Sequence, residues 1–374
     1  MIRVLEAFGE PISYGGQESF VMGTIPHMDS NDFEFDLLTP YYCDNSQHRR
    51  WIKNHGGNVY ELGIEFNPGA DRRPIVKPVS NFLDAHYYDV MHIHSGSTSV
   101  LGLLAKVAKE HGIPLVLTHS HSPVEHFTLK NWIIREMCSW DIERCADVLC
   151  ACSQNASEAK YAPRLQSRVH IITNGIDVHK FSYRPEIRVR VREELNLPEQ
   201  AYVVGHVGRF SYEKNQQYLI EVFSRIRKLD KSAYLLLVGA GDTKTAIEEQ
   251  IASLGLQSSV VFTGAIDNVS DVLQAMDVFA FPSKFEALGI SLIEAQSTGL
   301  PVVASNRVPE EAQISEAYVR LPISPEMIEK WAESILSFRH YSRKDGTQLA
   351  VNSGYDVEDT AHYLATIYKC GHVS

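Results

Sequence analysis

The fold class can be read from one segment, Val278-Phe-Ala-Phe-Pro-Ser-Lys-Phe-Glu-Ala-Leu-Gly-Ile-Ser-Leu-Ile-Glu-Ala-Gln-Ser-Thr-Gly-Leu-Pro-Val-Val-Ala304. Two short apolar runs, Val278–Phe281 and Pro301–Ala304, are typical of buried strands. Ile290–Gly299 lies between them and has a helical pattern. A strand, a helix and a second strand in this order indicate two parallel strands of one sheet with a helix covering one face.

The same alternation of short apolar runs and helical patterns continues along the chain. It predicts an α/β protein whose parallel sheets are covered on both faces. The strand candidates form two series, which we interpret as two doubly wound units. The first series is Ile2–Ala7, Phe33–Leu38, Val59–Glu61, Val90–His94, Leu115–Thr118, Val148–Ala151 and Val169–Ile172; the second is Tyr202–Val207, Tyr234–Val238, Val260–Thr263, Val278–Phe281 and Pro301–Ala304.

The length of the chain, 374 residues, also favours two domains, because a single hydrophobic core rarely grows beyond 250–300 residues. A polar stretch, Tyr183–Leu197, separates the two series of strands. We therefore predict a first domain of residues 1–182 and a second of residues 183–355. The last patterned segment, Asp356–Lys369, has the spacing of an amphipathic helix.

The composition excludes several classes of function. The formal net charge is −11 and both halves of the chain are acidic, so no nucleic-acid partner is expected. No secretory signal and no apolar run long enough to span a bilayer is visible, which favours a cytoplasmic protein. The six cysteines show no C-x-x-C spacing, so we expect reduced thiols and no zinc site.

In an open parallel sheet, ligands bind at the carboxyl ends of the strands, and the strongest candidate site follows the strand Val278–Phe281. The N–H groups of Leu288–Ser291 begin a helix, and such donors together with the helix dipole favour a diphosphate. Gly289 allows close approach of the backbone, while Glu286 and Glu294 would contact different parts of one elongated ligand. The alternative is that Glu286 only caps the helix and Glu294 is a solvated helix residue.

A second candidate site follows the strand Tyr202–Val207. Gly208 ends this strand, and Arg209 and Lys214 lie on the loop before the next helix. Two cations at a strand end can neutralise a leaving diphosphate. The alternative is a pair of charged loop residues without a ligand.

A third, weaker motif is Ser13-Tyr-Gly-Gly-Gln-Glu18 after the first strand. It differs from the G-x-G-x-x-G dinucleotide fingerprint, which argues against a nicotinamide cofactor. Adjacent glycines let backbone donors face a ligand, although a simple tight turn would have the same sequence.

Four histidines lie at the ends of two successive strands. His92 and His94 share one face of the first strand, and His119 and His121 share one face at the second. Such a group can bind a metal, but no acidic partner has the spacing of a metallohydrolase. A polar lining of a ligand site is the favoured interpretation.

Taken together, these motifs resemble glycosyltransferase family 4, in particular its bacterial capsular and exopolysaccharide branch. The resemblance covers essentially the whole chain and is densest in the second half. The motifs that carry the resemblance are Asn174-Gly-Ile-Asp177, Gly208-Arg209, Lys214-Asn215, Val238-Gly-Ala-Gly241, Phe262-x-Gly264, Pro282-Ser283 and two glutamates, Glu286 and Glu294, separated by seven residues.

The resemblance implies a GT-B fold, in which two Rossmann-like domains face each other across a cleft and a C-terminal helix, residues 356–374, returns to the first domain. It also implies a retaining sugar transfer without a required metal or other cofactor. The catalytic residues implied are His119 facing the sugar, Arg209 and Lys214 on the diphosphate, and Glu286 on the sugar hydroxyls. The donor-binding residues implied are Gly16, Gly208, Val269 at the base, Ala287, Leu288, Gly289 and Ile290 at phosphate and sugar, and Glu294 at the ribose.

The partners implied are a nucleotide-sugar donor, with UDP favoured, and a glycan or polyprenyl-linked acceptor. Ala287 and Gln17 depart from the family pattern, which leaves the sugar and the acceptor open. Trp132, Ile133 and Ile134 are candidates for peripheral contact with a membrane, although their pattern is more typical of buried helix residues.

Three other functions are compatible with parts of the sequence. A nucleotide-sugar epimerase can have the same paired domains, and a metallohydrolase would use the histidine group. A binding protein without catalysis would bind the donor and not turn it over, but the complete set of cations and glutamates argues against it.

Overall fold

The computed structural model describes residues 1–13, 15–122, 128–266 and 268–371. The chain divides into two compact units, which we describe separately. The first unit comprises Met1–Gly175 and the C-terminal segment from Asp356, and the second comprises Ile176–Tyr355.

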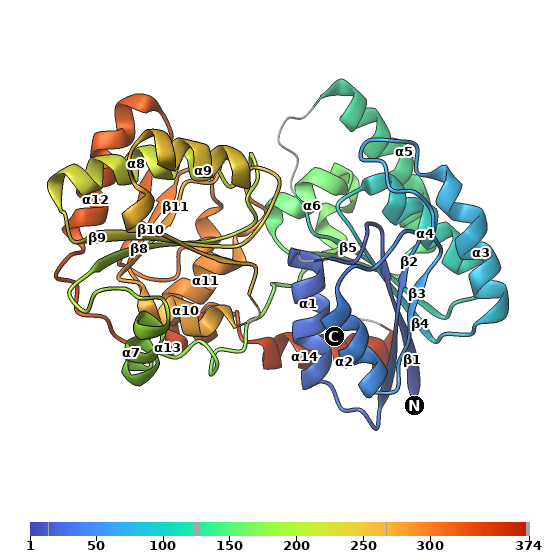
Figure 1. Ribbon diagram of the computed structural model, residues 1–374. Coiled ribbons are helices and arrows are strands. Elements are labelled where there is room, and N and C mark those ends of the chain that lie inside the picture. Colours follow the sequence, from blue (N-terminus) through green and yellow to red (C-terminus); the bar gives the residue numbers. More distant parts are fainter. Residues whose placement is uncertain (14, 123–127, 267, 372–374) are drawn as a thin grey trace. The chain divides into compact units, whose positions relative to one another are not determined.

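The first unit is built on a parallel sheet with the strand order β3-β2-β1-β4-β5-β6-β7 (Figure 1). The chain passes from β1 outward to β3 and then returns to the other side of β1, so the first and fourth strands are neighbours. The strands are β1 (Ile2–Phe8), β2 (Phe33–Thr39), β3 (Val59–Glu61), β4 (Val90–Ser95), β5 (Leu115–Ser120), β6 (Val148–Ala151) and β7 (Val169–Ile171). The helices are α1 (Gly16–Thr24), α2 (Ser46–Asn54), α3 (Val76–Ala85), α4 (Thr98–Glu110), α5 (Leu129–Cys145), α6 (Gln154–Lys160) and α14 (Val357–Cys370).

The C-terminal helix α14, red in Figure 1, is part of this first unit. Its apolar face, with Leu364, Ile367 and Tyr368, is buried in the same hydrophobic cluster as Phe20 of α1 and Phe33 of β2. Asp356 caps the helix by accepting a hydrogen bond from the backbone N–H of Glu358. The end of the chain therefore covers the sheet that the beginning of the chain builds.

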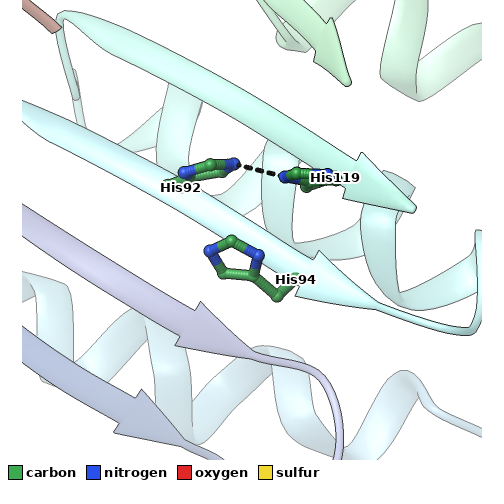
Figure 2. A group of neighbouring side chains, drawn as sticks. All are labelled: His92, His94 and His119. Carbon is green, nitrogen blue, oxygen red and sulfur yellow. Dashed lines mark hydrogen bonds between the residues drawn. The ribbon is translucent and has the colours of Figure 1, made fainter. Parts of the chain in front are cut away.

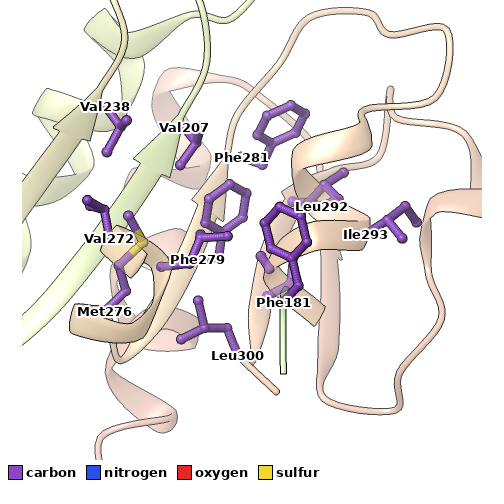
Figure 3. Packing of buried hydrophobic residues seen from close by; sticks show 14 of the residues in the cluster. Phe181, Val207, Val238, Val272, Met276, Phe279, Phe281, Leu292, Ile293 and Leu300 are labelled. Atoms are coloured by element: carbon purple, nitrogen blue, oxygen red, sulfur yellow. The ribbon is translucent and has the colours of Figure 1, made fainter. Parts of the chain in front are cut away.

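The second unit has a six-stranded parallel sheet with the order β10-β9-β8-β11-β12-β13. Apolar side chains of this unit fill the space between the sheet and its helices (Figure 3). The strands are β8 (Tyr202–Val207), β9 (Ala233–Val238), β10 (Val260–Gly264), β11 (Val278–Phe281), β12 (Val302–Ser305) and β13 (Tyr318–Leu321). The helices are α7 (Pro185–Glu194), α8 (Gln216–Leu229), α9 (Lys244–Ser253), α10 (Val269–Ala275), α11 (Ile290–Ser297), α12 (Ile328–Ser337) and α13 (Thr347–Asn352).

The predicted α/β class with two parallel sheets is confirmed, and two details differ from the prediction. The edge strand β13 was not predicted, because its two middle residues are only half buried and its apolar pattern is short. The second unit begins at Ile176, before the predicted junction at 182/183. Ile176, Val178 and Phe181 account for this difference, because they are buried in the core of the second unit.

Helix α5 differs from its predicted burial. Trp132, Ile133 and Ile134 were expected to be mainly buried, but 46%, 44% and 36% of their surfaces are exposed. Met137 and Trp140 of the same helix are also exposed. Among the helices of the described residues, none is both long and apolar enough to cross a membrane.

We predict that Gly205→Ala destabilises the second unit, because a Cβ at this position on the central strand β8 would lie 1.9 Å from Sδ of Met276. Overpacking of this kind typically costs about 1–3 kcal/mol. Urea unfolding measures the free energy of unfolding. Gly23→Ala in α1 is the control, since a Cβ there meets no atom within 4 Å. Equal stabilities of Gly205→Ala and Gly23→Ala would contradict the proposed packing.

Candidate functional site

The structure brings Lys214 and Glu286 together in the second unit. Lys214 lies on the loop between β8 and α8, and Glu286 lies between β11 and α11. Because β8 and β11 are neighbours in the sheet, their following loops lie side by side. Lys214 Nζ donates to Glu286 Oε1 at 2.6 Å, and only 22% and 11% of the two side chains are exposed. A largely buried ion pair thus occupies the carboxyl edge of the sheet.

Further contacts fix the loop that carries Lys214. Asn215 has left-handed backbone angles, and its side-chain amide donates to the carbonyl of Pro282 on the neighbouring loop at 3.2 Å. Gln216 donates to the carbonyl of Arg209 at 2.9 Å, and the amide of Lys284 donates to the carbonyl of Glu213. The two loops therefore hold each other at the position of the ion pair.

The N-terminus of α11 provides backbone donors next to Glu286. Gly289 precedes the helix with φ of 85°, a left-handed conformation that favours glycine. Within the described part of the chain, the N–H groups of Leu288, Gly289 and Ile290 have no hydrogen-bond acceptor. Free N–H groups and the helix dipole together suit an anion.

Glu294 lies in α11 and is partly buried. Burial raises the pKa of Glu294 to about 7, and the positive charge of Lys180 opposes the shift. At neutral pH this carboxyl is therefore poised between its neutral and ionised forms, so it can either donate or accept a hydrogen bond.

Three other residues predicted for the donor site lie in this unit, and none of them joins the ion pair of Lys214 and Glu286. Arg209 is mainly exposed, and its guanidinium pairs with the exposed Asp242 at 3.8 Å instead of joining Glu286. Gly208 is close to the Lys214 side chain, because a Cβ there would lie 3.4 Å from Lys214 Cδ. Val269 is the first residue of α10 and is partly buried against the core.

In the first unit, the predicted glycine turn opens α1. Asn174 donates its side-chain amide to the carbonyl of Gly16 at 3.1 Å, which links the turn to the loop after β7. The carboxylate of Glu18 accepts from the backbone N–H of Ser13 at 3.0 Å. A Cβ at Gly15 would approach Glu18 Oε2 to 2.7 Å, so a larger residue there would have to displace the Glu18 carboxylate. Tyr14 of the same motif lies outside the described residues.

His119 is one of four histidines that contact one another in the first unit. His94 lies within β4, as the predicted strand Val90–His94 has it, whereas His119 lies within β5 and not after the end of that strand as predicted (Figure 2). His119 Nδ1 and His92 Nε2 are 3.2 Å apart, and His94 Nδ1 and His121 Nε2 are 2.9 Å apart. Burial lowers the pKa of His94 to about 3, and it also lowers the pKa of the other three. The four rings are therefore neutral at physiological pH.

The same histidines offer the nitrogens that a transition metal would need. Ligand atoms of His92, His94 and His119 lie within 4.8 Å of one another. However, both ring nitrogens of His92, both of His94 and Nδ1 of His119 already have hydrogen-bond partners. An ion would have to displace some of those hydrogen bonds. The hydrogen bonds account for the arrangement of the rings.

Sequence reasoning missed three residues of these sites. Glu6 of β1 is 3% exposed, and its Oε2 lies 2.6 Å from His94 Nε2. Tyr368 of α14 donates to Glu6 Oε1 at 3.0 Å. Glu10 accepts hydrogen bonds from Ser95 and Gln17 beyond the end of β1. A carboxylate inside an apolar strand was the signal available for Glu6, because such a charge is rarely buried without a partner.

The two halves of the chain match two family descriptions. Residues 14–180 match "Glycosyltransferase Family 4" and residues 188–350 match "Glycosyl transferases group 1". These two ranges together cover most of the sequence.

Similar proteins include EpsF of Bacillus subtilis (strain 168), which is 28% identical over 95% of this chain and 93% of its own length. A second relative, the Escherichia coli UDP-Gal:alpha-D-GlcNAc-diphosphoundecaprenol alpha-1,3-galactosyltransferase, is 29% identical over 59% of this chain and 58% of its own. The crystal structure of Anabaena Alr3699/HepE with UDP and glucose has a TM-score of 0.76 at 20% identity and covers 99% of this chain and 100% of its own. This last likeness concerns the fold.

We predict that Glu294→Gln stabilises the protein increasingly as the pH rises from 5 to 8. A carboxyl whose pKa is raised by folding binds its proton more tightly in the folded state. The free energy of unfolding therefore falls as the pH rises from about 4.5 to about 7. Glutamine does not titrate, so the variant should be more stable than the parent by about 1–3 kcal/mol at pH 8 and nearly equal to it at pH 5.

Urea unfolding at the two pH values measures this difference. Glu249→Gln is the control, since Glu249 is exposed on α9. A difference between Glu294→Gln and the parent that does not change with pH would contradict the raised pKa.

Proposed function

Because the chain belongs to glycosyltransferase family 4, with two Rossmann-like units of the GT-B type, we propose that it is a retaining enzyme that uses a nucleoside-diphosphate sugar. The acceptor we propose is a hydroxyl group of a glycan or a polyprenyl-linked sugar in the synthesis of a surface polysaccharide. The observation that carries this proposal is the Lys214–Glu286 pair beside the unpartnered amides that begin α11.

In the proposed reaction, the bond between the sugar and the diphosphate breaks and negative charge develops on the leaving group. Lys214 and the amides of Leu288, Gly289 and Ile290 stabilise that charge in a largely buried site. Arg209 adds a second cation once its exposed side chain turns from Asp242 toward the phosphates. Glu286 binds hydroxyls of the sugar, which becomes positively charged at its reacting carbon.

The acceptor hydroxyl attacks the sugar from the side that the diphosphate leaves, and a phosphate oxygen takes the proton of that hydroxyl. The configuration at the sugar carbon is thereby retained without a protein nucleophile. Lys214 and the helix amides supply the positive potential that a metal ion supplies in other transferases, so we propose a reaction without a required metal or cofactor.

We propose a UDP-sugar as the donor. Support comes from the E. coli relative, whose name specifies UDP-Gal and a diphosphoundecaprenol acceptor, and from HepE, which was crystallised with UDP. Glu294 would bind the ribose and Val269 would border the base. The remaining contacts would come from the first unit, where Gly16 approaches the phosphates and His119 faces the sugar.

We predict that Lys214→Ala lowers kcat by about a hundredfold or more, because a single preorganised charge-stabilising group commonly contributes this much to turnover. The measurement is release of the nucleoside diphosphate from a panel of nucleotide sugars with and without acceptor. Lys244→Ala is the matched control, because Lys244 belongs to the same unit and pairs on the surface with Glu248.

The same assay separates the proposal from its rival. Release that depends on the acceptor supports a transferase, whereas conversion of the donor sugar without release of the diphosphate would show an epimerase. Near-normal turnover by Lys214→Ala would refute the proposed role of this residue.

We further propose that α5 contacts the inner face of the membrane, where a polyprenyl-linked acceptor would lie. Large apolar side chains are exposed along this helix: 74% of Leu129, 46% of Trp132, 67% of Met137 and 54% of Trp140. The guanidinium of Arg164 lies 4.6 Å from the ring centre of Trp140 and pairs with Glu136 and Glu143, so the support for this contact is the exposed apolar surface and not a net positive charge. Tryptophan is enriched where a bilayer meets water.

We predict that the double variant Trp132→Ala, Trp140→Ala reduces binding to phosphatidylcholine–phosphatidylglycerol vesicles, measured by co-sedimentation. Tyr341→Ala is the control, since Tyr341 is an exposed aromatic residue of the second unit. Turnover with a water-soluble acceptor should be unchanged, because none of the residues proposed for the donor site lies on α5. Equal vesicle binding by parent and double variant would refute a membrane contact through α5.

A further inference from the structure

Glu6 is the centre of a hydrogen-bond network that has two branches. One branch runs from Glu6 Oε1 to the hydroxyl of Tyr368 (3.0 Å), on to His92 Nδ1 (2.7 Å), and from His92 Nε2 to His119 Nδ1 (3.2 Å). The other runs from Glu6 Oε2 to His94 Nε2 (2.6 Å) and from His94 Nδ1 to His121 Nε2 (2.9 Å). Each branch ends at a buried ring nitrogen, His119 Nε2 or His121 Nδ1, that has no partner among the described residues.

The direction of every hydrogen bond in the first branch follows from the charge of Glu6. Burial raises the pKa of Glu6, and the hydrogen bond from Tyr368 opposes that shift by stabilising the ionised form. In its ionised form the carboxylate only accepts, so the Tyr368 hydroxyl donates to it and accepts from Nδ1–H of His92. A neutral His92 then has a bare Nε2, which accepts from Nδ1–H of His119. Nε2 of His119 is consequently left without a proton.

The second branch is directed in the same way. His94 donates its Nε2–H to Glu6, so its Nδ1 is bare and accepts from Nε2–H of His121. A single proton added to Glu6 can reverse one branch only, because it can be donated either to Tyr368 or to His94. The two terminal nitrogens therefore cannot both become donors.

We propose that Glu6, acting through Tyr368 and His92, fixes the tautomer of His119 so that Nε2 accepts a hydrogen bond from a sugar hydroxyl. This inference rests on the proposed function, in which His119 faces the transferred sugar. Tyr368 and His92 are then positioning residues, and the C-terminal helix α14 takes part in the site by supplying the Tyr368 hydroxyl. The direct distance from His92 Nδ1 to Glu6 Oε2 is 3.6 Å, too long for a hydrogen bond, so Tyr368 is the required link.

The test is the ¹⁵N chemical shift of each ring nitrogen in the ligand-free, histidine-labelled protein. In the parent we expect Nδ1–H in His92 and His119, and Nε2–H in His94 and His121. Glu6→Gln presents one donor and one acceptor in place of two acceptors, so exactly one branch should reverse, with both of its histidines changing tautomer together. The inference would be overturned if the parent showed a different set of tautomers. It would also be overturned if Glu6→Gln left all four tautomers unchanged.

Tyr368→Phe is a gentler variant that retains the buried ring. It should leave His94 and His121 unchanged and release His92 and His119 into mixed tautomers. Tyr363→Phe is the matched control, because its hydroxyl lies on the same helix and contacts His170 at 3.2 Å, outside the network. Equal spectra for Tyr368→Phe and Tyr363→Phe would also overturn the inference that Tyr368 links Glu6 to His92.

Kinetics tests the second half of the inference. Loss of one neutral hydrogen bond to the donor should raise KM for the nucleotide sugar about 3- to 10-fold in Tyr368→Phe, with a smaller change in kcat and no change in Tyr363→Phe. An unchanged KM would show that the tautomer of His119 does not serve donor binding. The spectra are recorded without a substrate, so the test of the tautomers does not depend on the transfer reaction. Lys214→Ala tests that reaction separately.

Discussion

A parallel strand that is covered on both faces can carry a polar side chain only where that side chain finds a partner, either at the carboxyl end of the strand or inside the core. This constraint governs both units of the protein. In the second unit, polar residues gather beyond the ends of β8 and β11, where Lys214 meets Glu286. In the first unit, β1, β4 and β5 carry carboxyl and imidazole groups within the sheet, and these groups hydrogen-bond to one another except at Nε2 of His119, which has no partner among the described residues.

Strand order converts this constraint into a site. β8 and β11 are separated by about seventy residues of sequence but are direct neighbours in the sheet. The loops that follow them are consequently adjacent, and contacts such as that of Asn215 with Pro282 lock them together. Two loops that are each ordinary by themselves thereby form one surface that combines a cation, a carboxylate and free amides, which is the chemistry that a nucleotide sugar requires.

The sequence was sufficient for features that depend on local pattern. Apolar runs located the strands of both sheets except β13, and strand ends pointed to Lys214, Glu286 and the turn at Gly289. It was insufficient where the outcome depends on distant residues. Glu6 and Tyr368 are 362 positions apart, and no local pattern could pair them. The same holds for Arg209, whose side chain pairs with Asp242 on another loop. It also holds for Trp132, whose exposure depends on which helix face the rest of the unit covers.

The ion pair also determines how the proposed donor site would attract an anion. A lysine that already neutralises Glu286 adds little net charge to the site, so the pair alone would bind a diphosphate weakly. The free amides before Ile290 have no such counter-charge and therefore dominate the initial attraction. Glu286 in turn holds Lys214 in place before the ligand arrives, which reduces the entropy lost on binding. In the proposed reaction, sugar hydroxyls that engage Glu286 would free the Lys214 ammonium to follow the charge that grows on the leaving phosphate. The pair would thus make stabilisation of the leaving group depend on correct binding of the sugar.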